Sequence, residues 1–339
     1  MSAPLVTVLL PVFNGGDLLE ATLQSVLRQT FSDFEVLAID DASTDGTSER
    51  LRAIRDPRVR VLTNESNLGL TRSLNRGLAD ARGELIARQD ADDLSAPTRL
   101  EKQLGFLRAH PEVQLLGTSA WRLRANGKVF GANDLPSTHQ AIRWTSATDN
   151  AFLHTSVMFR RDVIRGGFGG YDEDFPICQD YELWNRVAAE HPVANLPERL
   201  VSMREHPASM TKTQPAATTE EIRRILAVNW ARLFPRREIT RDEGDLLAEF
   251  RLRFPAQKLP ALRRLLTELL EEFLATYPAA RQSADFHATL CRQSLRIAYK
   301  FLNVDQRVAA SEMARAFAHS PAEWIRQGCT SLRCGLSRR

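Results

Sequence analysis

The chain has 339 residues, which is long for one domain and short for three at roughly 100–200 residues per domain. Hydrophobic residues make up 43% of it and charged residues 26%, a balance typical of soluble globular proteins that excludes intrinsic disorder as the main state. The formal net charge of +3 is too small to indicate a general nucleic-acid binder, so no nucleic-acid partner is expected.

The first ninety residues alternate between the patterns of strand and helix. Continuous aliphatic runs predict strands buried on both faces, and apolar residues at helical spacing predict helices between them. The predicted strands are 5–12, 35–39, 59–62 and 84–88, and the predicted helices are 17–28, 47–54 and 70–81. A βαβ series of this kind predicts a parallel sheet with right-handed crossovers.

After Asp93 the alternation becomes irregular. Pro97 suits the first position of a helix that continues to about residue 109. Further strands are predicted at 113–123, 156–159 and 200–203, with a helix at 181–189. The mixture predicts an α/β fold with a mixed, mainly parallel sheet flanked by helices.

A polar, proline-containing stretch at 211–219 (TKTQPAATT) predicts a domain boundary. Nearly every later segment has helical spacing, at 226–234, 246–254, 262–277, 290–302 and 308–318. The predicted organisation is a catalytic domain over 1–213, a linker over 214–219 and an all-α C-terminal domain over 220–339.

Polar or acidic residues follow three of the predicted parallel strands, as PVFN at 11–14, DDASTD at 40–45 and RQDADD at 88–93. Ligands of open α/β sheets bind at the carboxyl ends of the strands. Clustered carboxylates repel one another unless a cation shares their site, and hard oxygen ligands suit Mg²⁺ or Mn²⁺ together with phosphate oxygens. The pattern therefore predicts a nucleotide diphosphate bound with a divalent metal. The simpler alternative is that these loops only cap helices and form Asx turns.

Six motifs in order resemble a family 2 glycosyltransferase with a GT-A (Rossmann-like) fold. They are PVFN (11–14), IDDASTDGT (39–47), NLGLTRSLNRGL (67–78), ARQDADD (87–93), HTSVMFRR (154–161) and QDYELW (179–184). The resemblance covers about residues 4–210 and not the helical C-terminal region. It implies inverting transfer of a sugar from a nucleotide diphosphate sugar, a UDP-sugar being favoured, to a hydroxyl acceptor. The acceptor would be a sugar or a lipid-linked or protein-linked hydroxyl, in bacterial-type surface polysaccharide or glycolipid biosynthesis.

The same resemblance implies roles for residues on the donor side. The nucleotide-sugar site would comprise Pro11, Phe13, Asn14, Asp40, Asp41, Arg72, Arg88 and Asp90. Asp92 would ligate the divalent metal, Mn²⁺ or Mg²⁺, and His206 would complete the metal or diphosphate site. Two alternatives stay open: Arg88 forms a salt bridge with a neighbouring aspartate, and His206 is a surface residue.

On the acceptor side, the resemblance places Asp180 as the general base, which inversion at an anomeric carbon requires. An N-cap of the predicted helix is the alternative role for Asp180. His154 either contacts the acceptor or fixes the loop beneath it. Trp184 either forms a wall of the acceptor site or belongs to the core.

Two other functional classes remain open. A sugar-1-phosphate nucleotidyltransferase would be expected to carry an arginine in a glycine-rich loop after the first strand, and PVFNGGD has none. A catalytically inactive donor-binding scaffold would have no need of both Asp92 and Asp180.

The C-terminal part of the chain is basic, with 21 Lys and Arg against 14 Asp and Glu from Glu220 onward, a net +7, which leaves −4 for residues 1–219. Near the end, basic and apolar residues are mixed: Trp324, Ile325, Arg326, Leu332, Arg333, Leu336, Arg338 and Arg339. This segment either contacts an anionic membrane or is a solvated helix end. No CxxC pair, secretory signal or span of about 18 apolar residues is found. The expected location is the cytoplasm, with or without contact to the inner face of the membrane.

Overall fold

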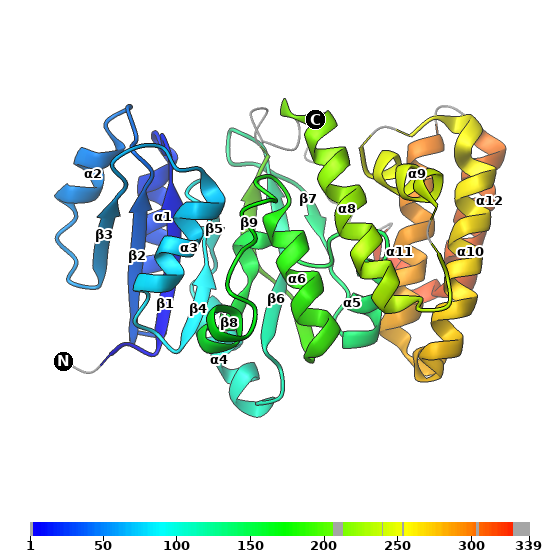
Figure 1. Ribbon diagram of the computed structural model, residues 1–339, viewed down its shortest axis with the longest axis horizontal. Coiled ribbons are helices and arrows are strands. Elements are labelled where there is room, and N and C mark those ends of the chain that lie inside the picture. The colour runs from blue at the N-terminus through cyan, green and yellow to red at the C-terminus, as the bar shows by residue number, and fades with distance from the viewer. Residues whose placement is uncertain (1–2, 206–212, 239, 253, 303–304, 328–339) are drawn as a thin grey trace. The chain divides into compact units, whose positions relative to one another are not determined.

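The computed structural model describes residues 3–205, 213–238, 240–252, 254–302 and 305–327 (Figure 1). The chain forms two compact units, and the first contains residues 3–134 and 152–205. The second combines Leu135–Ala151 with the described residues from 213 onward. Residues 135–151, which we expected in the catalytic domain, are thus grouped with the C-terminal helices. Most of the expected linker lies inside helix α8 (Pro215–Leu233).

The first unit contains a nine-stranded mixed sheet in the order β3-β2-β1-β4-β8-β6-β9-β5, with β7 paired to β6. The strands are β1 (Val6–Val12), β2 (Phe34–Asp40), β3 (Val59–Thr63), β4 (Leu85–Arg88), β5 (Leu94–Ser95), β6 (Leu115–Leu123), β7 (Val129–Asn133), β8 (Met158–Arg160) and β9 (Val193–Arg204). Strands β3, β2, β1 and β4 are parallel, as are β6 and β9, whereas β8, β7 and β5 are antiparallel to their neighbours. The predicted fold class is confirmed.

Helices flank this sheet (Figure 1). They are α1 (Leu18–Leu27), α2 (Thr47–Ala53), α3 (Leu70–Asp80), α4 (Arg99–Ala109) and α6 (Gln179–Glu190). Every residue of β1 and β2 is buried, which explains their unbroken aliphatic runs. One face of β1 packs with the apolar stripes of α1 and α4. On the other face, Gly77 of α3 lies so close to Leu9 and Ile39 that a Cβ atom would be 2.3 Å and 2.9 Å from their side chains.

Three elements of the first unit differ from expectation. The two-residue strand β5 and the half-exposed strand β7 carry too little apolar periodicity to be predicted. Strand β9 begins at Val193 rather than near residue 200, because its first four residues are buried beside β6. Pairing with β6 therefore extends the strand across Pro197 and Glu198, which are both exposed.

The second unit consists of helices α5 (His139–Ser146), α8, α9 (Arg241–Leu252), α10 (Leu259–Thr276), α11 (Ala284–Phe301) and α12 (Gln306–His319). Helix α5 belongs here because the Trp144 ring is 5.5 Å from the Phe273 ring and 6.2 Å from the Phe286 ring. The carboxylate of Asp285 also accepts hydrogen bonds from the backbone N–H groups of Ser137 and Thr138, at 2.9 Å and 2.8 Å. In the described part of the chain, no helix combines the length and apolar character that a bilayer crossing needs.

Candidate functional site

The carboxyl ends of β1, β2 and β4 lie side by side at one edge of the first unit's sheet (Figure 1). Phe13, which follows β1, is 51% exposed, whereas Pro11 is buried inside the strand. Strand β4 ends at Arg88, opposite Leu9, while β1 continues to Val12 beside β2. The loops predicted to bind the donor therefore start from three neighbouring strands at the same edge.

The loops after β1 and β2 are tied together by hydrogen bonds. Asn14 donates its backbone N–H to the Ser43 hydroxyl at 2.9 Å and accepts from the Thr44 N–H at 2.8 Å. Asn14 and Ala42 have positive φ angles of 52° and 59°, which are uncommon for residues other than glycine. The buried Asp40 accepts from the Ser43 N–H at 3.1 Å and fixes the second loop from below. Strained backbone held by such bonds is frequent at ligand sites.

Asp41 holds the loop that precedes α3. Its carboxylate accepts hydrogen bonds from the Asn64 amide at 2.6 Å and from the backbone N–H groups of Leu68 and Gly69 at 2.8 Å and 2.9 Å. A carboxylate has about four acceptor positions, so these bonds leave about one for a ligand. Asp41 is also buried. Its predicted contact with the nucleobase would therefore have to use that remaining position.

The turn at residues 90–93 concentrates three carboxylates. Asp93 is buried and accepts from the Arg204 backbone N–H at 2.7 Å. Burial and the charges of Asp90 and Asp92 raise the pKa of Asp93 well above its usual value. Asp92 is partly exposed, and the Asp90 side chain is 34% exposed. The turn thus presents oxygen ligands and a negative potential that a cation would relieve.

These residues fit a divalent metal that is bound together with a diphosphate. Within residues 3–205 and the other described ranges, no group of three or more His, Cys, Asp or Glu side chains forms a closed metal site. Mg²⁺ bound to nucleotides needs no such cage, because one or two carboxylates, waters and phosphate oxygens suffice. His206, the other predicted ligand, lies outside the described residues.

Arg88 forms the salt bridge that was the alternative to diphosphate contact. Its side chain has no exposed surface, and its Nη2 donates to the Asp90 Oδ1 at 2.7 Å. Its Nε donates to the His154 Nε2 at 3.3 Å. These contacts of the buried Arg88 agree with the salt-bridge alternative.

His154 and Trp184 belong to a buried aromatic cluster. His154 Nε2 is 3.0 Å from the Tyr171 hydroxyl, and burial followed by the charge of Arg88 lowers the pKa of His154 well below its usual value. Trp184 is 1% exposed, and its ring is 5.6 Å from that of Phe159. Trp184 is therefore a core residue instead of a wall of the acceptor site, and the contacts of His154 are those of a residue that fixes a loop.

Asp180 lies in the first turn of α6 and is partly exposed. The nearby Glu182 is paired with Arg186 at 2.7 Å, which neutralises its charge. Asp180 and Asp90 both raise the pKa of the buried Tyr171 hydroxyl, after the larger effect of burial itself. The Tyr171 ring is also 5.9 Å from the ring of Trp184, which lies one turn after Asp180 on α6.

Arg72 projects from α3 at the surface. Its Nε is 2.9 Å from the Glu173 carboxylate, and both side chains are about half exposed. Exposed pairs of this kind contribute little to stability, typically about 0–1 kcal/mol, so exchanging Glu173 for a ligand phosphate would cost little.

Three buried polar residues beneath the acidic turn were missed in the sequence, namely Gln89, Arg99 and Gln103. Burial, followed by the charge of Arg88, lowers the pKa of Arg99 to about 9, so the guanidinium stays charged at neutral pH. The only signal in the sequence is that Arg99 and Gln103, four residues apart, fall on the same helix face as Leu100, Leu104 and Leu107.

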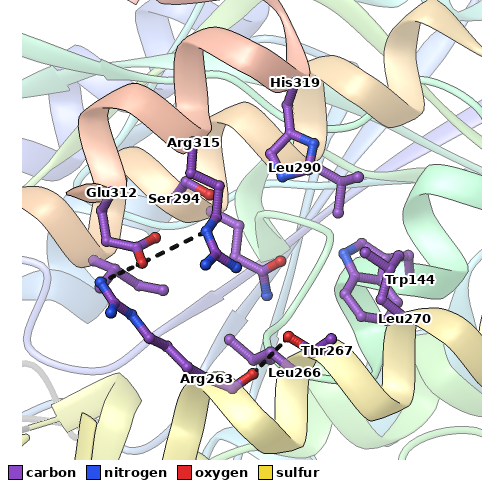
Figure 2. Close-up of a pocket in the computed structure, with 12 residues that line it drawn as sticks. Trp144, Arg263, Leu266, Thr267, Leu270, Leu290, Ser294, Glu312, Arg315 and His319 are labelled. Atoms are coloured by element: carbon purple, nitrogen blue, oxygen red, sulfur yellow. Dashed lines mark hydrogen bonds and ion pairs between the residues drawn. The ribbon is translucent and has the colours of Figure 1, made fainter. Parts of the chain in front are cut away.

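A separate cavity of about 50 Å³ lies inside the second unit (Figure 2). Its polar side includes Arg263, whose Nη2 is 2.7 Å from the carboxylate of the buried Glu312, and also Arg315. The Trp144 indole N–H at its edge is buried and has no hydrogen-bond partner among the described residues. The apolar side is made of Leu266, Leu270, Leu290 and Ile297. The volume suits a few water molecules, and ligand pockets are several times larger, so this cavity is not a candidate active site.

Comparison with known proteins supports the sequence resemblance. Residues 7–168 match the model of glycosyl transferase family 2. The chain is 36% identical over 210 residues to the putative glycosyltransferase EpsE of Bacillus subtilis, covering 60% of this chain and 74% of that protein. It is 35% identical over 193 residues to the amylovoran biosynthesis glycosyltransferase AmsE of Erwinia amylovora, covering 55% and 70%.

Solved structures share the fold. S. aureus TarS 1–349 in complex with UDP-GlcNAc superposes with a TM-score of 0.56 at 17% identity, covering 97% of this chain and 92% of that one. The mannosyltransferase PcManGT of Pyrobaculum calidifontis, in complex with GDP-Man and Mn²⁺, superposes with a TM-score of 0.53 at 20% identity, covering 95% and 88%. The sequence matches and the GT-A-like sheet agree: the chain is a glycosyltransferase that belongs to glycosyltransferase family 2.

Proposed function

We propose that this glycosyltransferase moves a sugar, with inversion, from a nucleotide diphosphate sugar to a hydroxyl acceptor. The observation that supports the proposal is a chain of contacts from Asp90 through Arg88, His154 and Tyr171 to Trp184, which lies one turn after Asp180 on α6. Membership of the family argues against the alternative of a nucleotidyltransferase.

On the donor side, we assign Asp90 and Asp92 to the diphosphate and its metal, with Mn²⁺ or Mg²⁺ as the ion. A divalent ion would supply positive charge for the leaving diphosphate. Arg88 holds the Asp90 carboxylate in place from below. Phe13 offers an exposed ring face for the nucleobase, and Arg72 offers a half-exposed cation whose pairing with Glu173 would cost little to exchange for a phosphate. His206 would complete this site.

On the acceptor side, we assign Asp180 as the general base. It would take the proton of the acceptor hydroxyl while the new bond to the anomeric carbon forms and the bond to the phosphate oxygen breaks on the opposite face. One carboxylate suffices, because the diphosphate leaves without needing a proton from the protein. Glu182, already paired with Arg186, does not compete for this role.

For the substrates, we favour a UDP-sugar and an acceptor in surface polysaccharide or glycolipid assembly. TarS is described in complex with UDP-GlcNAc, although PcManGT is described with GDP-Man, so the nucleotide must be tested directly. AmsE is named for amylovoran biosynthesis, which supports a sugar hydroxyl as the acceptor.

The test is nucleotide diphosphate release from a panel of UDP-, GDP- and dTDP-sugars with Mn²⁺. Asp180→Asn should lower transfer to acceptor by about 10²–10⁴-fold with little change in donor binding, since it removes only the base. Asp162→Asn, an 88% exposed carboxylate of the same unit, is the control and should leave transfer unchanged. NMR of the product should show the inverted anomeric configuration.

Three outcomes would contradict the proposal. Donor binding without any turnover would indicate a scaffold. Pyrophosphate release from a nucleoside triphosphate would indicate a nucleotidyltransferase. Transfer that is unaffected by Asp180→Asn would remove Asp180 from the mechanism.

We also propose that the basic C-terminal region contacts an anionic membrane surface, on the cytoplasmic side where nucleotide sugars are made. Trp324 and Ile325 are 37% and 56% exposed, and residues 328–339 lie outside the described residues. Flotation with anionic vesicles should fall for Trp324→Ser/Ile325→Ser. The control Val228→Ser, another exposed apolar residue, should float as the parent does. Equal flotation of all three proteins would contradict the contact.

A further inference from the structure

A fully buried layer of polar side chains lies directly beneath the acidic turn. Gln89, Arg99 and Gln103 are each at most 1% exposed. Buried polar groups are costly unless they are hydrogen-bonded, so a layer like this needs a compensating arrangement. The hydrogen bonds of this layer lead from Arg99 on helix α4, through Gln89, to the backbone oxygens of Asp90 and Asp93.

Gln89 clamps the turn at its two ends. Its side-chain Nε2 donates to the backbone oxygens of Asp90 at 3.1 Å and of Asp93 at 3.0 Å. Its Oε1 accepts from the Ser95 hydroxyl at 2.7 Å and from Arg99 Nη1 at 3.0 Å. The amide thus uses both of its N–H donors and both acceptor positions of its oxygen.

Arg99 determines which way this amide points. A guanidinium has only donors, so it can face the oxygen of Gln89 and not the NH₂ group. The NH₂ group is therefore left to face the two carbonyl oxygens of the turn. Arg99 is held in turn by Nη2 bonds to the Arg88 and Val157 oxygens at 2.8 Å and 3.3 Å, and by a Nε bond to Gln103 Oε1 at 3.0 Å.

The turn needs such a clamp because its three carboxylates repel one another. The three carboxylates lie within four consecutive residues, and the backbone bond that closes the turn, from the Asp93 N–H to the Asp90 oxygen, is long at 3.4 Å. The Asp90 N–H also donates to the Thr155 hydroxyl at 3.1 Å, so Gln89 is one of the groups that hold this turn. Without the clamp, repulsion would open the turn and redirect the two outer carboxylates.

We propose that Gln89, oriented by Arg99, is a positioning residue of the donor site. It fixes the backbone of residues 90–93, and through it the directions in which Asp90 and Asp92 project toward the donor diphosphate. This inference rests on the proposed function, because it assumes that those two carboxylates bind the donor with its metal.

The chain contains a matched control for this role. Gln103 lies on the other side of Arg99, is equally buried, and also accepts one bond from the guanidinium. Its Nε2 donates to two backbone oxygens as well, those of Ser156 at 2.9 Å and Leu116 at 3.3 Å. Neither of these oxygens belongs to the acidic turn. Gln89→Glu and Gln103→Glu therefore keep the Arg99 contact and each lose two N–H bonds to carbonyl oxygens. Each also adds a negative charge, so Ser95→Ala, which weakens the hold on Gln89 without adding a charge, must shift the same quantities in the same direction.

Two measurements on the full chain test the proposal. In the metal-free protein, hydrogen exchange of the backbone N–H groups at 90–95 should be faster in Gln89→Glu than in Gln103→Glu. With donor and Mn²⁺, Gln89→Glu should raise the donor KM and the half-saturating Mn²⁺ concentration by about tenfold, the equivalent of losing two buried hydrogen bonds. Gln103→Glu should change both by less than about twofold, and the two variants should unfold at similar temperatures.

Ser95→Ala provides a milder variant in case Gln89→Glu does not fold. It removes one of the two donors to the Gln89 oxygen and should shift the same quantities in the same direction by about threefold. Equal effects of the two Gln→Glu substitutions would overturn the proposal, as would faster exchange with an unchanged donor KM. If Asp92→Asn leaves sugar transfer intact, the proposed donor site is wrong. If Asp92→Asn lowers transfer as expected but Gln89→Glu and Gln103→Glu behave alike, the donor site stands and only the role of Gln89 is refuted.

Discussion

Both units bury charged side chains, but they differ in what those charges serve. In the first unit, every side-chain nitrogen of Arg88 and Arg99 has a hydrogen-bond partner, and both residues lie beneath a partly exposed acidic turn. In the second, Arg263 and Glu312 pair with each other beside a small cavity whose Trp144 N–H has no partner among the described residues. The buried charge of the first unit therefore contacts an acidic turn, whereas the Arg263–Glu312 pair of the second joins helices α10 and α12. Substitutions in the first should change activity, and those in the second should change stability.

The largest expected difference is in catalysis. Asp92→Asn should lower sugar transfer by about 10³-fold, because it removes a charge that faces the donor diphosphate and its metal. Glu312→Gln, a similar loss of one carboxylate charge in the second unit, should leave kcat within about twofold. Both are measured as nucleotide diphosphate release in the presence of acceptor. Equal losses would show that the two sites are not functionally distinct.

Stability should respond in the opposite way. Arg263→Met should lower the free energy of unfolding by about 3 kcal/mol, because it removes the nearer of the two cations that face the 1% exposed Glu312 carboxylate. Arg315→Met is the control, since Arg315 is 48% exposed and 3.9 Å from the same carboxylate, and it should cost less than about 0.5 kcal/mol. The double variant Arg263→Met/Glu312→Met should recover most of the loss. Urea denaturation that gives equal values for the two single variants would refute this account.

The second unit should also lose stability in acid through His139. Burial, followed by the charge of Arg143, lowers the pKa of His139 from 6.5 to about 4, so the unfolded chain binds a proton in this range that the folded chain does not. Above pH 6.5 this histidine is neutral in both states and does not change the free energy of unfolding. As the pH falls from 6.5 toward 4, proton binding by the unfolded chain lowers the free energy of unfolding by about 2 kcal/mol, after allowance for partial exposure. In His139→Gln, the free energy of unfolding should fall by about 2 kcal/mol less between pH 6.5 and pH 4 than it does in the parent. Parallel pH profiles for the parent and His139→Gln would rule it out.

The smallest effect concerns the cluster between Asp90 and Asp180. Tyr171→Phe removes the hydroxyl that is 3.0 Å from His154 and should cost about 1 kcal/mol of stability. Because Tyr171 touches no ligand in the proposed mechanism, kcat should change by less than about threefold. Tyr299→Phe, at a 51% exposed position, should change neither quantity. A large loss of kcat in Tyr171→Phe would give the buried cluster a direct role in the reaction.

The sequence predicted the parallel half of the sheet well, because β1, β2 and their helices carry their own periodicity. It was less informative where an element depends on a partner. Strand β5 is two residues long and exists through pairing with β9. Helix α5 was missed because its strongest contact, Trp144 against Phe273, joins segments more than a hundred residues apart.

The residues of the candidate site also fall into two groups, those that the sequence alone predicted and those whose position only the tertiary structure decided. Residue types and strand ends alone placed Asp90, Asp92 and the loops around Asn14 and Asp41 at one edge of a nucleotide-binding sheet. Only the tertiary structure determined that Arg88 is buried against Asp90, that Trp184 is in the core, and that Gln89 is hydrogen-bonded to the backbone of the acidic turn. The physical reason is that periodicity reports which face of an element is apolar. The partner of a polar side chain depends on register and packing between segments far apart in the chain.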